Sequence, residues 1–423
     1  MGKFKLMPAI YLYNGQCVKK DTKDILGDGD AVELAVSYNN HGADSILIFD
    51  YSSNDAEHDA NIGTVIKMAD SVDIPMIVGG NIKRLEDVKK YLYAGAYKIF
   101  LDSTKESNIE LIEEAAERFG NDKIAIKVDK GYDYENIKQF KYSGVSLVIA
   151  DGCAEECLKY GLKVLPYNET FAFNDLVEFA KTKKTYGIVE SSFDNEFDFF
   201  NFKSQLKSEG VNTNIFESSM KFSDFKLNKD GMIPVIVQDY KTDKVLMLAY
   251  MTEEAFNMTM KTGKMTYYSR SRDEIWVKGM TSGHYQYVKE LTMDCDKDTM
   301  LAKVRQVGVP CHTGADTCFF NNIVKEDYDN SNPMKVFEET FNVILDRKKN
   351  PKDGSYTNYL FDKGIDKILK KVGEECTEIV IAAKNPDPQE IKYEISDFLY
   401  HVMVLMVEKG VSWKDITTEL SRR

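Results

Sequence analysis

The residues best suited to chemistry lie in one stretch, from position 294 to position 318. It begins with D-C-D-K-D, and two further cysteines follow near its end, the first of them opening a C-H-T-G motif. The residues before it are apolar and aromatic, as in a strand, where side chains alternate between two faces. We therefore expect Asp294, Asp296 and Asp298 to share one face of a strand, with Cys295 on the other.

Such a stretch can hold two kinds of metal ion. Carboxylates on one face repel one another unless a hard cation lies among them, and Mg²⁺ or Ca²⁺ takes oxygen ligands. Thiolates suit Zn²⁺, and the available thiols are Cys295, Cys311 and Cys318. The pattern therefore predicts an oxygen site and a sulfur site back to back.

Three other structures can carry the same residues. An EF-hand also begins D-x-D-x-D, but Thr299 and Arg305 replace the Gly and the Glu that its loop requires, so this interpretation fails. A closed structural zinc site, with His312 as fourth ligand, stays open because three cysteines leave the fourth position undetermined. A solvated strand edge also stays open for the aspartates.

A second set of carboxylates occurs near the C-terminus, where apolar spacing predicts helices. Side chains three and four residues apart share a helix face. The set consists of Glu374, Glu375 and Glu378 on one predicted helix and Glu394 and Asp397 on the next. One charged row is usually solvated, but two rows on adjacent helices form a better cradle for Mg²⁺, which proteins hold with a few carboxylates plus substrate phosphates.

Short apolar runs and helical patterns alternate over the first 220 residues. The runs lie at 6–12, 45–50, 75–78, 98–101, 123–128, 146–150, 163–166 and 186–189. Eight strand–helix units predict a (β/α)8 barrel. An open doubly wound sheet is the alternative, because strand count alone does not prove closure.

The middle region predicts two hairpins with a helix between them. The first joins 235–240 to 245–249, and the helix begins after Thr252 as N-cap and ends at Gly263. The second hairpin joins 264–271 to 274–278. Arg270 and Arg272 alternate with serines there, so we expect both on one strand face, where paired guanidinium groups suit phosphate; an exposed strand with salt bridges is the alternative.

The C-terminal region is predicted to be wholly helical. Two longer helices are expected at 362–383 and 388–409, after a polar linker at 325–333. The second is expected to turn Ile391, Ile395, Phe398, Val402, Leu405 and Met406 inward.

The middle region, from about 228 to 320, resembles phosphoribosyl-AMP cyclohydrolase of histidine biosynthesis. The matching motifs are M-L-A-Y-M at 247–251, Y-S-R-S-R at 268–272, K-G at 278–279, T-S-G-H at 281–284, D-C-D-K-D, and C-H-T-G with the later cysteine. The resemblance implies that the three cysteines bind a catalytic zinc, often shared across a dimer, and that the aspartates bind magnesium.

The same resemblance implies hydrolytic opening of the adenine ring of phosphoribosyl-AMP. Zinc would lower the pKa of a bound water to about 7, and either His312 or His284 would transfer the proton. We expect Arg270, Arg272 and Lys278 to bind the substrate.

The C-terminal region, about 334–420, resembles phosphoribosyl-ATP pyrophosphohydrolase. The motifs are G-S-Y-T at 354–357, K-K-V-G-E-E at 370–375, A-A-K at 382–384 and the carboxylate rows. The resemblance implies that Mg²⁺ on these carboxylates promotes hydrolysis of phosphoribosyl-ATP to phosphoribosyl-AMP and pyrophosphate. We expect Glu375 and Glu378 to be catalytic, and Arg347, Lys370 and Lys371 to hold phosphates.

The first half resembles two barrel enzymes of the same pathway, the isomerase and the cyclase subunit of imidazole-glycerol-phosphate synthase. The cues include P-A-I-Y-L-Y-N-G-Q-C-V at 8–18 and V-G-G-N-I at 78–82. Those enzymes use aspartates at the ends of strands one and five, where this chain has Tyr11 and Lys127. Neither replaces a carboxylate in proton transfer at neutral pH without a large pKa shift. We therefore expect a barrel without its ancestral activity, serving as scaffold, dimer contact or substrate shuttle.

Composition limits the partners and the compartment. The chain has 423 residues and a net charge of −13, with no long basic run, so we expect neither nucleic acid nor an anionic membrane as partner. Seven cysteines, three of them candidate ligands, fit a reducing compartment. No signal peptide is visible and no apolar run reaches the roughly 18 residues of a membrane span, so we expect a cytoplasmic protein.

These inferences predict a multidomain enzyme. They place a degenerate (β/α)8 barrel-like domain at 1–220, a β-rich α+β cyclohydrolase domain with zinc at 226–324, and an all-α pyrophosphohydrolase domain at 334–423. The two reactions are consecutive, the expected cofactors are Zn²⁺ and Mg²⁺, the ligands are phosphoribosyl-ATP and phosphoribosyl-AMP, and the expected assembly is a homodimer. The alternative is a nucleotide pyrophosphatase of other specificity joined to a binding module with structural zinc.

Overall fold

The chain forms two compact units, Met1–Ile323 and Val324–Arg423. The computed structural model describes residues 2–132, 137–140, 142–181, 185–326, 335–386 and 388–421. Most of the predicted linker at 325–333 and the predicted domain limits at 334 and 423 lie outside these residues. Over the described ranges, no helix combines the length and the apolar character that crossing a membrane requires.

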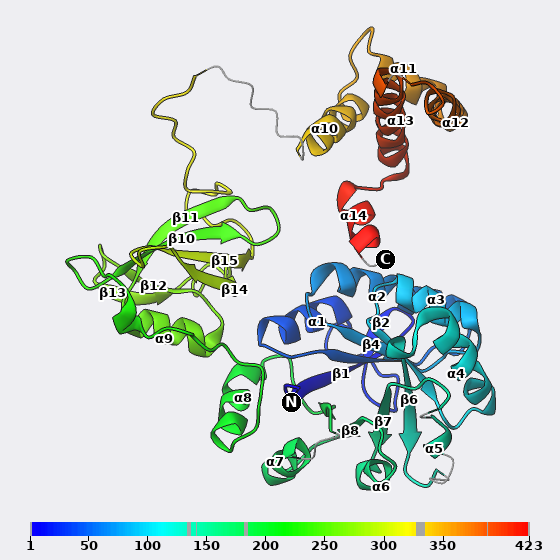
Figure 1. The fold of residues 1–423 in the computed structure, drawn as a ribbon, viewed down its shortest axis with the longest axis vertical. Coiled ribbons are helices and arrows are strands. Elements are labelled where there is room, and N and C mark those ends of the chain that lie inside the picture. The colour runs from blue at the N-terminus through cyan, green and yellow to red at the C-terminus, as the bar shows by residue number, and fades with distance from the viewer. Residues whose placement is uncertain are drawn as a thin grey trace. The chain divides into compact units, whose positions relative to one another are not determined.

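The first part of the larger unit is a closed barrel (Figure 1). Its strands are β1 (Lys5–Tyr13), β2 (Gln16–Val18), β3 (Ile46–Asp50), β4 (Met76–Gly79), β5 (Lys98–Asp102), β6 (Ile124–Asp129), β7 (Leu147–Asp151), β8 (Val164–Asn168) and β9 (Gly187–Glu190). β2 is an antiparallel hairpin partner of β1, and the other strands pair in parallel. Because β1 also pairs with β9, the barrel prediction is confirmed and the open sheet is wrong.

Helices follow the strands and surround the barrel (Figure 1). They are α1 (Ala31–Asn40), α2 (Asp55–Ser71), α3 (Leu85–Tyr93), α4 (Glu106–Phe119), α5 (Ile137–Phe140), α6 (Ala154–Leu158), α7 (Phe173–Lys181) and α8 (Phe199–Ser208). Asp30 and Asn54 cap α1 and α2 by accepting backbone N–H groups that a helix start leaves unpaired. Strand side chains alternate between the barrel interior and the layer beneath the helices, so β1 places Met7 and Tyr11 inside and Leu6 outside.

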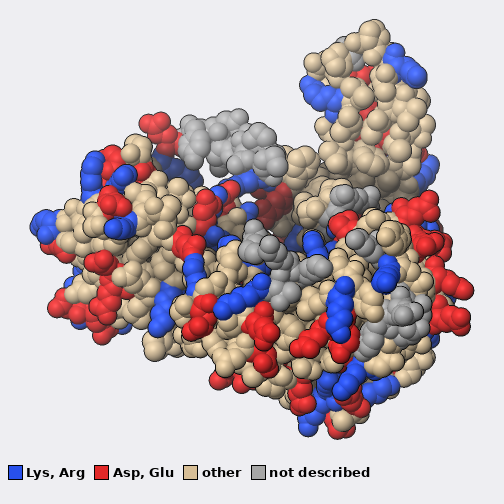
Figure 2. Space-filling view, turned by 60° about the horizontal axis from the view of Figure 1, so that its bottom comes forward, with Lys and Arg blue, Asp and Glu red and all other residues tan. Residues whose placement is uncertain are grey.

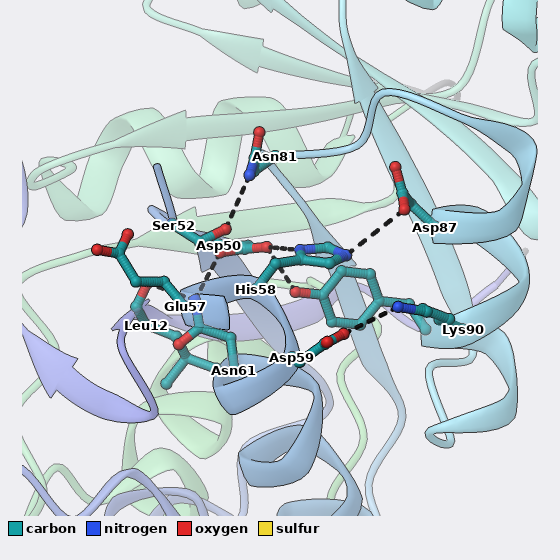
Figure 3. A network of polar contacts seen from close by, with 12 residues as sticks. Leu12, Asp50, Ser52, Glu57, His58, Asp59, Asn61, Asn81, Asp87 and Lys90 are labelled. Atoms are coloured by element: carbon teal, nitrogen blue, oxygen red, sulfur yellow. Dashed lines mark hydrogen bonds and ion pairs between the residues drawn. The ribbon is translucent and has the colours of Figure 1, made fainter. Parts of the chain in front are cut away.

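A buried network ties β3 to the helices beside it (Figure 3). The carboxylate of Asp50 accepts hydrogen bonds from His58 Nδ1 at 2.5 Å, Asn61 Nδ2 at 2.5 Å, the Tyr91 hydroxyl at 2.7 Å and the Ser52 N–H at 2.8 Å. These donors lie on α2, on α3 and in the loop after β3. Asp50 is therefore fully engaged in holding the barrel wall together.

The second part of the larger unit is the β-rich middle domain. Its main sheet has the order β11-β10-β15-β14, formed by β10 (Ile233–Asp239), β11 (Val245–Met251), β14 (Gln286–Met293) and β15 (Met300–Gln306). The remaining elements are the hairpin of β12 (Thr266–Ser269) with β13 (Glu274–Val277), and α9 (Glu253–Thr262). The Thr252 side chain caps α9, and Gly263 ends it in a left-handed conformation, with a φ of 68°. The two predicted hairpins and the helix are confirmed.

The smaller unit is all helical. Its helices are α10 (Val336–Lys349), α11 (Tyr356–Lys363), α12 (Ile365–Ala382), α13 (Pro388–Lys409) and α14 (Trp413–Ser421). The predicted helix at 362–383 is wrong at its start, because Gly364, with a φ of 78°, separates α11 from α12. The inward face predicted for α13 is also wrong in part: Ile395 is 41% exposed, and the buried residues are His401, Met403, Val404, Met406 and Val407. The apolar core covers only the second half of α13, while the first half carries carboxylates.

Charged side chains of both signs occur together on one face of the molecule (Figure 2). On the face that Figure 2 shows, lysine and arginine side chains alternate with acidic ones among the described residues. The chain as a whole has 68 acidic and 55 basic residues.

Candidate active sites

Two of the predicted zinc ligands lie side by side. The thiol of Cys311 is 3.1 Å from Thr313 Oγ1 and also contacts the thiol of Cys318. The bond with Thr313 lowers the pKa of Cys311, whereas partial burial and the neighbouring thiol raise the pKa of Cys318. Lys278 lies close to both, and burial lowers the pKa of its amine against the opposing effect of the thiols. The structure thus joins a thiol pair to a buried amine.

Cys295 lies elsewhere in the same chain. It follows β14 in the turn to β15, whereas Cys311 follows the other end of β15. The two strands are antiparallel, and a strand of 7 residues such as β15 spans roughly 20 Å. The expectation of adjacent sulfur and oxygen sites therefore does not hold within one chain, and no group of three metal-ligating side chains in the described residues includes a cysteine.

The three aspartates converge, but not on a strand. Ligand oxygens of Asp294, Asp296 and Asp298 lie within 4.8 Å of one another, and all three residues are exposed. β14 ends at Met293, and Asp294 Oδ1 then accepts the N–H groups of Asp298 at 3.0 Å and Thr299 at 3.2 Å. The predicted strand face is wrong because the Asp294 side chain closes a turn instead.

The two arginines also lie in a turn. β12 ends at Ser269 and β13 begins at Glu274, so Arg270 and Arg272 do not share a strand face as predicted. The guanidinium of Arg270 lies over the Tyr250 ring, 4.0 Å from its centre, and Arg272 Nε is 3.3 Å from Glu274 Oε1. Both arginines are exposed, which leaves them accessible to an anionic ligand.

One candidate histidine lies within the C-H-T-G segment, and the other contacts the residues just before it. His284 packs on Gly308, where an added Cβ would lie 2.5 Å from the imidazole ring. Gly308 thus makes room for His284 shortly before Cys311. His312 follows Cys311 directly and is exposed.

The C-terminal carboxylates form a compact cluster between two helices. Glu375 on α12 lies within 4.8 Å of Glu394 and Asp397 on α13, measured between ligand oxygens. Glu378, one turn beyond Glu375, hydrogen-bonds Glu394. Partial burial and the charges of the neighbouring carboxylates raise the pKa of Glu394. Such repulsion favours a cation at this point.

The other residues predicted to bind metal or phosphate in this domain lie outside the carboxylate cluster, some of them beside it. Glu374 pairs with Lys370 at 3.3 Å and with Lys371 at 3.1 Å and is not part of the cluster. Lys371 also lies 3.5 Å from Glu375. Arg347, on α10, pairs with Asp346 at 3.2 Å.

Sequence reasoning missed His401 and the role of Tyr356. His401 is 5% exposed, and its Nδ1 lies 3.6 Å from Glu375 Oε1 and 2.8 Å from the carbonyl oxygen of Asp397. Because a carbonyl only accepts, Nδ1 carries a hydrogen toward Asp397, and Nε2 is hydrogen-bonded to the Tyr356 hydroxyl at 3.0 Å. The spacing of Asp397 and His401 by one helical turn was the signal available in the sequence.

Tyr11 and Lys127 lie at the end of the barrel where enzymes of this fold have their active site, and both side chains are occupied by contacts with neighbouring residues. The Tyr11 hydroxyl is 2.6 Å from that of Tyr167, and burial raises the pKa of Tyr11 to about 12. Lys127 pairs with Asp129 and, at 3.5 Å, with Asp151. Although burial opposes them, these carboxylates hold the pKa of Lys127 above its usual value. Neither group is available as a base at neutral pH.

Three known families match separate parts of the chain. The family model described as phosphoribosyl-AMP cyclohydrolase matches residues 247–320, and that of phosphoribosyl-ATP pyrophosphohydrolase matches residues 336–423. A third model, described as histidine biosynthesis protein, matches residues 5–165. The thiol pair lies in the first match and the carboxylate cluster in the second, and the third covers the barrel from β1 to the start of β8.

Whole proteins with the two enzymatic domains are also similar. The histidine biosynthesis bifunctional protein HisIE of Thermoanaerobacter pseudethanolicus is 50% identical over 209 residues, which cover 97% of that protein and 46% of this chain. The HisIE protein of Caldanaerobacter subterraneus is 52% identical over 200 residues, covering 96% of it and 47% of this chain. That of Bacillus subtilis is 44% identical over 205 residues, covering 97% of it and 48% of this chain. With a thiol site, a carboxylate cluster and near-complete coverage of these relatives, the chain belongs to the HisIE family of bifunctional histidine biosynthesis enzymes and carries an additional histidine-biosynthesis-type barrel.

Proposed function

We propose that the chain converts phosphoribosyl-ATP to phosphoribosyl-AMP at the α12–α13 cluster and opens the adenine ring at the Cys311–Cys318 site. The cyclohydrolase domain would extend over 226–324, the pyrophosphohydrolase domain over 334–423 and the barrel over 1–220. The observation that carries the proposal is the four-carboxylate cluster inside the region of pyrophosphohydrolase similarity.

Both enzymatic domains belong to families that generally use metal ions. The residues fit such ions. The lowered pKa of Cys311 favours the thiolate, the form that binds Zn²⁺. The cluster of Glu375, Glu394 and Asp397 offers hard oxygen ligands at close range, as does that of Asp294, Asp296 and Asp298, and both suit Mg²⁺.

The zinc site of the proposal is complete only in a homodimer. Cys311 and Cys318 of one copy would hold the ion together with Cys295 of the other. This assembly places the exposed aspartate turn of one copy near the thiol pair of the other. A site of three thiolates is then possible although Cys295 lies far from Cys311 and Cys318 within one chain.

In the ring-opening step, zinc bound there would activate water for hydrolysis. His312 or His284 would transfer the proton, since His312 follows Cys311 directly and His284 packs on Gly308, three residues before Cys311. Lys278, Arg270 and Arg272 would hold the phosphates of phosphoribosyl-AMP, because charge-assisted bonds from cations suit phosphate oxygens.

In the pyrophosphate-releasing step, magnesium would neutralise the phosphate chain. Glu375, Glu378, Glu394 and Asp397 would hold that cation and orient the attacking water. Lys371, which already reaches Glu375, would bind phosphate with Lys370, and Arg347 would do so from α10.

The barrel is proposed to be inactive in its ancestral reactions. The aspartate positions of the related barrel enzymes hold Tyr11 and Lys127, and hydrogen bonds or ion pairs occupy both side chains. A general base needs an accessible lone pair near neutral pH, which neither provides.

Product analysis tests the two activities together. The full chain is incubated with phosphoribosyl-ATP, Mg²⁺ and Zn²⁺, and the products are identified by mass. We expect pyrophosphate and the ring-opened phosphoribosyl compound in equal amounts. Ordinary nucleoside triphosphates serve as the comparison: equal turnover of ATP would contradict the substrate assignment and favour a pyrophosphatase of wider specificity.

A further inference from the structure

The start of α11 is fixed by three consecutive side chains. Each is hydrogen-bonded to another helix: Tyr356 to His401 at 3.0 Å, Thr357 to Tyr400 at 2.7 Å, and Asn358 to the carbonyl oxygen of Arg347 at 2.6 Å. Thr357 and Asn358 are buried, at 8% exposure each. The backbone that carries Tyr356 is therefore held against α10 and α13.

Tyr356 differs from its two neighbours because its ring faces solvent. The residue is 46% exposed although its hydroxyl is bonded to the buried His401. Tyr359, one turn further along α11, is 43% exposed, and the two rings are inclined by 23° with their centres 6.2 Å apart. An aromatic side chain with an anchored polar end and an open ring is a rigid surface for stacking.

This ring borders the carboxylate cluster. The His401 imidazole links the two, since Nε2 is hydrogen-bonded to the Tyr356 hydroxyl at 3.0 Å and Nδ1 lies 3.6 Å from Glu375 Oε1. In phosphoribosyl-ATP a single ribose separates the purine from the triphosphate. A nucleotide whose triphosphate is held at the cluster can therefore reach Tyr356 with its purine.

We propose that Tyr356 stacks on the purine of phosphoribosyl-ATP and determines the preference for this substrate over ordinary nucleotides. The inference rests on the proposed role of the cluster as the pyrophosphohydrolase site. The ribosyl group on N1 makes the purine electron-poor, and the face of an electron-rich phenol ring attracts electron-poor and cationic groups. The stack thus favours an N1-substituted purine over unsubstituted adenine.

Competitive inhibition of pyrophosphate release by the full chain tests this selection. The inhibitors are ATP, its N1-methylated form (1-methyl-ATP) and tripolyphosphate, which has no base. We expect the wild type to bind 1-methyl-ATP more tightly than ATP. Tyr356→Ala should raise the inhibition constant of 1-methyl-ATP about tenfold, the effect of losing one base–aromatic stack, and abolish the difference between the nucleotides.

Two further readouts separate stacking from a structural role. Tyr356→Ala should leave the inhibition constant of tripolyphosphate unchanged, and should raise KM for phosphoribosyl-ATP with little change in kcat. Tyr356→Phe keeps the ring and should retain most of the preference for 1-methyl-ATP. Tyr393→Ala, which removes a 62% exposed tyrosine of α13, should change none of these constants.

Three results would overturn the proposal. One is an unchanged inhibition constant for both nucleotides in Tyr356→Ala; another is an equal rise for tripolyphosphate, which would show a structural role. The third is weaker self-association of Tyr356→Ala with unchanged nucleotide constants, because a second copy would then cover the ring. If Tyr356→Ala does not fold, Tyr356→Leu provides the same comparison. Pyrophosphate release by Glu375→Gln at the wild-type rate would instead contradict the site assignment itself.

Discussion

Cys295 and Cys311 lie at opposite ends of the hairpin formed by β14 and β15. The hairpin is antiparallel, so its length separates the two thiols within one chain. A twofold dimer can bring Cys295 of one copy to the thiol pair of the other, and its symmetry creates two equivalent sites. The zinc site that we propose, with all three cysteines as ligands, therefore requires two copies of the chain.

Mixing two inactive variants tests the shared site. Cys295→Ser and Cys311→Ser should each lose ring opening, because each lacks one thiolate. After the two are unfolded and refolded together, half of the dimers pair one copy of each variant and carry one intact site, so about a quarter of wild-type activity should return. Activity that stays at background after subunit exchange, in a folded dimeric mixture, would contradict a site built from two copies.

Separate substitutions should separate the two reactions. Cys311→Ser should abolish ring opening and spare pyrophosphate release, whereas Glu375→Gln should do the reverse, because the two sites lie in different domains. Glu374→Gln is the matched control: Glu374 pairs with Lys370 and Lys371 outside the cluster, so Mg²⁺-dependent pyrophosphate release should persist. Product mass and pyrophosphate assays measure both steps. Loss of both activities in a folded single variant would contradict the assignment.

Asp50 should stabilise the barrel in a pH-dependent way. Burial alone would raise its pKa, but hydrogen bonds from His58, Ser52 and Tyr91 outweigh this and hold the pKa below its usual value. A lowered folded pKa means that the carboxylate stabilises the fold above its unfolded pKa of about 3.9 and that this contribution is lost as the pH falls through the folded value.

Asp50→Asn should therefore lower the free energy of unfolding near neutral pH by roughly 1–3 kcal/mol, the cost of leaving a buried donor without its acceptor. Denaturant unfolding at several pH values measures this difference, which should shrink in acid. Asp59→Asn removes an exposed partner of Lys90 in the same region (Figure 3) and should cost less than about 1 kcal/mol. An Asp50 variant as stable as the wild type at pH 7 would show that the network contributes nothing.

Lys127 should be dispensable for both reactions. Lys127→Met removes the cation between Asp129 and Asp151 and should destabilise the barrel, because the two carboxylates then repel each other without the ammonium group that they share. Steady-state rates of ring opening and pyrophosphate release should stay at wild-type values in the folded protein. A specific fall in either rate, with unfolding midpoints unchanged, would show that the barrel mouth takes part in catalysis.

Much of the fold could be predicted from the sequence because the local sequence patterns agree with the tertiary structure. All eight predicted barrel strands are present to within about two residues, since each is a short apolar run that both faces of a parallel strand require. β2 was missed because a strand of 3 residues is too short to show a period. The N-cap at Thr252 and the helix end at Gly263 were predicted correctly because each depends only on the residue itself and on the adjacent helical turn.

The candidate sites were less predictable, and the misses share one cause. Asp294 and Arg270 were expected on strands, but the chain turns there through side-chain bonds and left-handed residues that a period of two does not reveal. Ile395 was expected inward, yet the partner helices cover only the far half of α13. His401 was not among the predicted site residues, and only its contacts with Glu375 and Tyr356 bring it to the cluster.

Residue type and spacing thus fixed which atoms are available: thiols for a soft ion, carboxylates for a hard one, and a barrel without its acid–base pair. Which of these atoms meet depends on contacts between segments far apart in the chain, and no local period encodes them. The hairpin keeps Cys295 from Cys311, and the packing of α12 on α13 joins Glu375 to Glu394 while leaving Glu374 outside. The available residue types and their local spacing can be predicted from the sequence, whereas the pairs of residues that meet depend on the tertiary structure.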